Sequence, residues 1–275
     1  MIRMTFPPEW HTLGREAELA AEQLAIGVTA LGRANHTQKG LYHQAFFALS
    51  NGFERLAKLI LVADYAVENN GEWMTDQTLK SIGHDISALL DACEPISAKH
   101  LSDKNWSERP NDPVHGAIVR TLSEFALLTR YYNLASLSGG KAALREPIQA
   151  WLSDVGMPIL DRHYSANQRA KDEARAAMVD ALLSPAIVLV HNEAGQPMMS
   201  IEEMMTRAGS TRVIQKYGRL YVMQLVRWLS VIMAKISRKG HRIEALYDLD
   251  EPFGIFRMED RYLRRRKTWS IYRRG

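Results

Sequence analysis

A long stretch without proline, from Thr37 to Asn69, constrains the fold of this chain more than any other feature. Apolar side chains recur along it at helical spacing, among them Phe46, Phe53, Leu56 and Ile60. A polar Asn-Asn-Gly run then ends the pattern, as is typical of a helix terminus. We therefore predict one continuous helix over this stretch, with these four side chains buried in a core.

Comparable patterns predict helices along most of the remaining chain. They fall at residues 14–32, 75–93, 114–137, 145–154 and 167–183. Ser200, with Glu203 three residues later, predicts the start of another helix by a capping box. Ser210 predicts the start of a long final helix that runs to about Ser237, before Gly240.

The chain is therefore expected to be all-α. A soft boundary at Gly139-Gly140 divides it into a helical bundle (residues 1–138) and a C-terminal helical region (residues 139–275). Two β-leaning aromatic segments near the end, residues 252–256 and 268–272, predict a small β-hairpin within a basic tail.

Composition narrows the class of protein. Of 275 residues, 46% are hydrophobic and 24% charged, which excludes wholesale disorder. The single cysteine, Cys93, excludes an intramolecular disulfide and predicts a reducing, cytoplasmic setting. Residues 1–10 lack the apolar run of a secretory signal. The apolar segment 219–236 contains Arg227, so we expect a buried helix and no membrane insertion.

The common enzyme motifs are absent from the sequence. It has no Walker loop, dinucleotide-type glycine fingerprint, nucleophile elbow or His-Glu-x-x-His pair. One cysteine cannot build a thiolate zinc site, and the histidine spacing shows no metal cluster. We therefore expect neither a metal nor a cofactor.

Three short segments carry a resemblance to a known superfamily. They are Asn51-Gly-Phe-Glu54-Arg55-Leu-Ala-Lys58, then Gly83-His84-Asp85, then Arg130-Tyr131-Tyr132-Asn133. Together they resemble the HEPN superfamily of helical bundles over roughly residues 41–137. The resemblance implies an N-terminal helical bundle, a homodimer and an RNA-directed role.

The first two segments also have a direct physical interpretation. Glu54 and Lys58 stand four apart on one predicted helix and can form an ion pair. Gly83 within a predicted helix suggests close helix contact, with His84 turned inward and hydrogen-bonded. We assign Glu54, Lys58, His84 and Asp85 a structural or nucleotide-binding role.

HEPN ribonucleases are similar in placing an arginine four to six residues before a histidine. Here the match is Arg109-Pro-Asn-Asp-Pro-Val-His115. The resemblance implies that Arg109 stabilises phosphate charge and that His115 assists attack by the 2′-hydroxyl, without a metal. Two prolines place Arg109 in a loop, however, so the alternative is a loop arginine beside a histidine in the first turn of a helix.

Two further groups of residues are candidates for binding RNA. Arg130, Tyr131 and Asn133 combine a cation with a ring that can stack on a base. The segment 257–274 carries eight cations against two carboxylates, with Arg264, Arg265, Arg266, Trp269 and Arg273 as its RNA-binding candidates. The alternative is that its arginines pair with Asp248, Asp250 and Glu251 and fasten the C-terminus to the bundle.

Two functions follow from these observations. One is a metal-independent endoribonuclease effector of a prokaryotic defence or toxin system. The other is a non-catalytic helical adaptor that binds a nucleotide, RNA or a protein partner. The prolines between Arg109 and His115 favour the adaptor, whereas the resemblance favours the ribonuclease.

Overall fold

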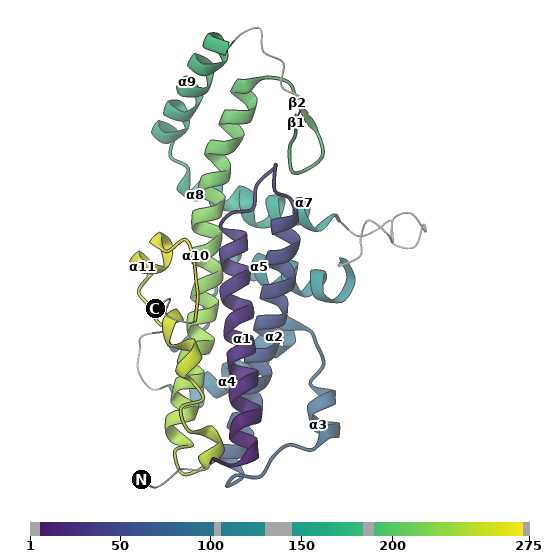
Figure 1. Cartoon of the computed structure of the whole chain (residues 1–275), viewed down its shortest axis with the longest axis vertical. Helices are drawn as coiled ribbons and strands as arrows, with labels where there is room; N and C mark the ends of the chain where they lie inside the picture. Colours follow the sequence, from purple (N-terminus) through teal and green to yellow (C-terminus); the bar gives the residue numbers. More distant parts are fainter. Residues whose placement is uncertain (1–5, 102–105, 130–144, 184–189, 272–275) are drawn as a thin grey trace.

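The computed structural model describes residues 6–101, 106–129, 145–183 and 190–271 and shows an all-α protein (Figure 1). Its α-helices are α1 (Pro8–Leu31), α2 (Gly40–Glu68), α3 (Asp76–Ser81), α4 (Ile86–His100), α5 (Pro113–Glu124), α7 (Pro147–Trp151), α8 (Met157–His163), α9 (Ala166–Leu183), α10 (Ile201–Lys239) and α11 (Asp260–Arg265). Short π-helical turns follow α5 and α7 at η1 (Phe125–Thr129) and η2 (Leu152–Gly156), and 3₁₀ turns lie at η3 (Glu244–Leu246) and η4 (Glu251–Phe256).

Helices α1 and α2 form a closely packed antiparallel pair at the centre of the molecule (Figure 1). The continuous helix predicted from Thr37 to Asn69 is confirmed, with its four named side chains buried. Glycines allow the close approach: Gly27 of α1 lies against Leu49, and Gly52 of α2 lies against Leu24.

Helix α10 is the longest element, with 39 residues, and it packs along the bundle (Figure 1). It contacts α2, α4 and α5 and buries Trp228, whose indole N–H donates to Ser97 Oγ at 3.1 Å. Beyond the bundle, its N-terminal part pairs with α9 as a projecting helical hairpin. Among the described residues, α10 alone is long and apolar enough to cross a membrane, but 83% of that apolar window is buried inside the protein.

The prediction of one continuous helix over residues 75–93 is wrong. It is broken at Gly83, whose φ of +75° lies in the left-handed region that favours glycine. Asp85 then caps α4 by accepting a hydrogen bond from the Ser87 backbone N–H at 2.9 Å. Pro95 lies inside α4 rather than after it. Gly83 therefore serves a turn and not a close helix contact.

Two other predicted elements differ in the structure. Ser210 does not begin a helix, because Ser200 caps α10 and the helix continues past Ser210, whose hydroxyl donates to Arg207 O at 2.8 Å. The predicted C-terminal hairpin is wrong, since η4 occupies residues 252–256 and the described residues 268–271 form no strand. The strands of the described chain are β1 (Val190–His191) and β2 (Pro197–Met198), an antiparallel pair that flanks a turn.

The buried core includes side chains from both sides of the predicted boundary at residues 139–140. Phe53 and Leu56 from the first half share one hydrophobic cluster with Trp228 and Ile232 from the second. The boundary glycines themselves lie outside the described residues.

Candidate functional site

Arg109 and His115, the predicted catalytic pair, contact different helices. Arg109 lies in the loop before α5, and its Nη1 donates to Asp91 Oδ1 at 2.5 Å and to Glu94 Oε1 at 2.9 Å, both on α4. His115 lies in the first turn of α5 and faces α10. Its Nε2 is 2.8 Å from Gln224 Oε1. In the part of the chain that the structure describes, Arg109 and His115 therefore do not share a pocket.

His115 is built into the packing between α5 and α10. The residue is 5% exposed, and its ring meets the Tyr221 ring edge-on with centroids 5.0 Å apart. Burial lowers the pKa of His115, which favours the neutral imidazole. Neutral Nε2–H then donates to Gln224, whose own Nε2 donates to Asp260 Oδ2 at 2.8 Å. This chain of hydrogen bonds links α5 through α10 to α11.

A second histidine lies nearby at the surface. His163, the last residue of α8, stacks on Tyr217 of α10 with ring centroids 3.7 Å apart and an interplanar angle of 1°. Both rings are partly exposed. His163 Nε2 also lies 3.0 Å from the Tyr221 hydroxyl, which accepts a hydrogen bond from Arg162 Nη1 at 2.8 Å. The hydroxyl proton is thus free to be donated to the imidazole.

Positive charge surrounds this stack. Burial lowers the pKa of His163, and the nearby charges of Arg162, Arg264 and Lys216 lower it further, against the opposing charge of Asp112. Lys216 also lies over the Tyr217 ring, with Nζ 5.2 Å from its centroid. We call these residues the α8–α10 patch; its members are Arg162, His163, Lys216, Tyr217, Tyr221 and Arg264.

The carboxylate that pairs with Arg162 of the patch is already engaged. Asp112 caps α5 by accepting from the Val114 backbone N–H at 2.9 Å and pairs with Arg162 at 2.6 Å. These bonds lower the pKa of Asp112 despite the raising effect of its partial burial. Among the described residues, Lys216 and Arg264 form no ion pair with a carboxylate. The patch is therefore net cationic.

Of the patch residues, sequence reasoning selected only Arg264. Arg162 and His163 were missed because nothing in the sequence pairs α8 with α10. A weak signal was present, since Tyr217 and Tyr221 stand four apart and share one face of a helix.

The basic tail is packed against the bundle through much of its length. Arg257 pairs with Asp250, one of the expected acidic partners. Trp269 is 6% exposed, and its backbone N–H donates to Thr29 Oγ1 of α1 at 2.9 Å. Arg266 lies over the Trp269 ring at 4.5 Å. This ring is therefore unavailable for base stacking, and these contacts match the alternative in which the tail is fastened to the bundle.

The other predicted RNA-binding residues have mixed outcomes. Arg264 joins the α8–α10 patch, and Arg265 on the same helix is exposed. Arg130, Tyr131, Asn133 and Arg273 lie outside the described residues.

Glu54 and Lys58 form the predicted ion pair, at 2.9 Å. His84 joins them, with Nδ1 2.7 Å from Glu54 Oε1, but its side chain is 71% exposed. The prediction that His84 is buried between helices is therefore wrong, because the turn at Gly83 carries it to the surface. The hydrogen bonds of Glu54 to Lys58 and His84 lower the pKa of this carboxyl against the raising effect of burial.

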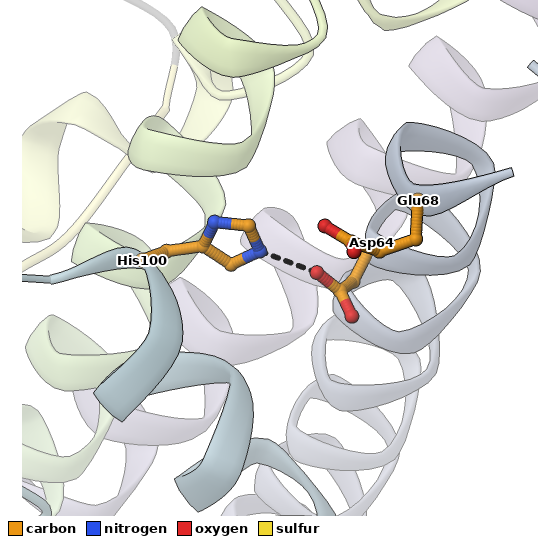
Figure 2. A group of neighbouring side chains, drawn as sticks. All are labelled: Asp64, Glu68 and His100. Carbon is orange, nitrogen blue, oxygen red and sulfur yellow. Dashed lines mark hydrogen bonds and ion pairs between the residues drawn. The ribbon is translucent and has the colours of Figure 1, made fainter. Parts of the chain in front are cut away.

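Figure 2 shows a cluster of three side chains of types that bind metal ions: Asp64, Glu68 and His100. His100 points toward Asp64, and its Nε2 is hydrogen-bonded to Asp64 Oδ1. The Lys99 ammonium lies 3.3 Å from Asp64 and 2.7 Å from Glu68, so both carboxylates already have a cationic partner. A metal on Nε2 would move the imidazole proton to Nδ1, which is buried without an acceptor. The cluster therefore fits an ion-paired link between α2 and α4 better than a metal site.

The fold and these side chains define an all-α protein with a cationic, aromatic surface patch. No protein-family model, curated protein or solved structure matches the chain. The HEPN relationship remains a prediction that depends on the short motifs described above.

Proposed function

We propose that this protein binds single-stranded RNA through the α8–α10 patch. The observation that carries the proposal is the partly exposed His163–Tyr217 stack, with Arg162, Lys216 and Arg264 around it. Exposed aromatic faces stack on unpaired bases, and neighbouring cations neutralise the adjoining phosphates.

The small number of cations limits the expected salt dependence. Each phosphate neutralised on a single strand contributes a log–log slope of about −0.7, so the two cations without a carboxylate partner among the described residues, Lys216 and Arg264, give a slope of about −1.4. This is a short contact, comparable to a few nucleotides. Stacking of a base on the exposed part of the His163–Tyr217 pair would add about 1–3 kcal/mol.

Binding fits the geometry better than cleavage at the predicted pair. The buried His115 ring has its Nε2 occupied by Gln224. The guanidinium of Arg109 is engaged by two carboxylates that oppose approach of a phosphate. We therefore expect RNA to remain intact after incubation, as a non-catalytic adaptor requires.

The test compares two double variants of the full chain by fluorescence anisotropy with a short single-stranded RNA. Lys216→Ala/Arg264→Ala removes two patch cations. Lys239→Ala/Arg242→Ala removes two exposed cations near the C-terminal end of α10, about 35 Å from Lys216 at 1.5 Å per helical residue. Circular dichroism checks that both variants remain helical.

The patch variant should bind more weakly and show a salt slope flatter by about 1.4, while the distal variant should match the parent protein. Tyr217→Ala should weaken binding about tenfold with little change in slope, because it removes stacking and no charge. Equal losses in the two double variants, or no binding by the parent protein, would contradict the proposal. Cleavage that disappears in His115→Ala would restore the ribonuclease hypothesis.

A further inference from the structure

A groove between α1, α2 and α3 is a separate candidate site. It consists of two adjoining cavities of about 360 and 560 Å³, within the size range of small-molecule sites. They share four lining residues, Thr12, Leu13, Val62 and Leu79, and so form one continuous depression.

The two ends of the groove differ in chemistry. The first cavity is mostly apolar: Pro8, Trp73 and Met74 line it beside the shared residues, and Glu9 is the one carboxylate among its described lining residues. The second cavity continues this apolar floor with Leu59 and then becomes polar. The charged and titratable residues that line it are Glu16, Arg55, Lys58, Lys80 and His84. Each of the three formal cations at this end pairs with a carboxylate: Arg55 with Glu16, Lys58 with Glu54 and Lys80 with Asp76.

These ion pairs are all partly exposed, so an incoming anion can compete with their carboxylates. Lys80 pairs with Asp76 across one turn of α3, but both side chains are about three-quarters exposed, so the pair is weak. Lys58 shares Glu54 with His84, which leaves one carboxylate to serve two donors. An anionic group here would complete the hydrogen bonding of the Lys58 ammonium, which has three protons to donate.

Helix α3 forms an adaptable wall of the groove. None of its residues is buried, and Leu79, which lines both cavities, is 39% exposed. Gly71 and Gly83, both with positive φ, flank the segment that carries Trp73 and α3. Its apolar side chains face a space that a ligand's apolar body would fill, with removal of apolar surface from water as the driving force.

We propose that this groove binds a small organic anion with an extended apolar body, with the anionic group at Lys58 and Lys80 and the apolar body along Leu13, Val62 and Leu79. The exposed ion pairs at one end and the apolar floor at the other favour such an amphipathic ligand. The proposal is independent of RNA binding, because the groove shares no residue with the α8–α10 patch.

The test uses octanoate as the probe and 1-octanol as its uncharged match, with binding to the full chain measured by titration calorimetry. Lys58→Met removes the ammonium but keeps an apolar stem, and Val62→Glu places a carboxylate in the floor. Lys171→Met on α9 is the matched control, because Lys171 is exposed and lies outside the lining of the groove.

Octanoate should bind about tenfold more tightly than 1-octanol, and Lys58→Met should abolish this preference. Val62→Glu should eliminate binding of octanoate, Lys171→Met should leave it unchanged, and the RNA-patch variants should bind it like the parent protein. Equal affinity for octanoate and 1-octanol, or undiminished binding by folded Val62→Glu protein, would overturn the proposal. Loss of octanoate binding in Lys171→Met would also overturn it.

Discussion

The contact between α1 and α2 allows a quantitative test of the packing argument. A Cβ atom added at Gly27 would lie 2.7 Å from Leu49 Cγ and 2.9 Å from the Leu49 backbone N. A flexible side chain can turn away, but the backbone N cannot yield unless the helices separate. Overpacking of this kind costs about 1–3 kcal/mol, against which alanine gains about 1 kcal/mol in helix propensity. Gly27→Ala should therefore lower the free energy of unfolding by up to about 2 kcal/mol.

Gly14 provides the matched control on the same helix, since a Cβ added there meets nothing within 4 Å. Gly14→Ala should raise the free energy of unfolding by about 0.5–1 kcal/mol, because only the propensity gain remains. Urea denaturation measures both variants. The difference between them isolates the steric cost of the helix contact.

The reciprocal glycine makes the test sharper. A Cβ at Gly52 would lie 2.7 Å from Leu24 Cγ and 3.0 Å from the Leu24 backbone N. One separation of the helices relieves both clashes, so Gly27→Ala/Gly52→Ala should cost less than the sum of the single variants. If Gly27→Ala proves as stable as Gly14→Ala, the close approach of these helices is refuted.

Three further predictions concern single residues. Because burial lowers the pKa of His115, the unfolded state takes up a proton more readily as pH falls below about 6.5. The parent protein should thus lose stability between pH 7 and 5 more steeply than His115→Gln in urea titrations, and parallel curves would contradict this. Burial raises the pKa of Cys93 to about 12, so its thiol should be inert to a thiol reagent at pH 8 until urea unfolds the chain; rapid labelling of the native protein would disagree. Gly83→Ala should lower the unfolding free energy by about 1 kcal/mol in urea, and Gly83→Asn by less, because asparagine tolerates positive φ; equal values would argue against strain at this turn.

The sequence predicted the fold best where local pattern decides structure. The apolar face of α2 is a property of consecutive residues, and its burial follows from helical periodicity alone. Gly83 shows the limit of that reasoning. A glycine within an apolar pattern is equally consistent with close packing and with positive φ, and only the observed φ of +75° separates the two.

The candidate site was harder to predict because its contacts are distant in sequence. His115 has its hydrogen-bond partner 109 positions away on α10, whereas Arg109 finds its carboxylates on α4. The number of residues between Arg109 and His115 therefore does not predict which side chains surround each of them in the fold. The His163–Tyr217 stack depends on how α8 docks on α10, which no local pattern encodes.

The position of α10 late in the chain has a consequence for biosynthesis. At about 5–20 residues per second, a ribosome completes Lys239 on the order of ten seconds or more after Glu68. Until then α2, α4 and α5 lack the helix that covers them, and Ser97 lacks its Trp228 partner. The apolar faces of the nascent amino-terminal helices are therefore exposed during this interval, and the chain must avoid aggregation through them. A ribosome stalled near residue 200 should display an incomplete core that binds apolar dyes, and release of the full chain should remove that signal.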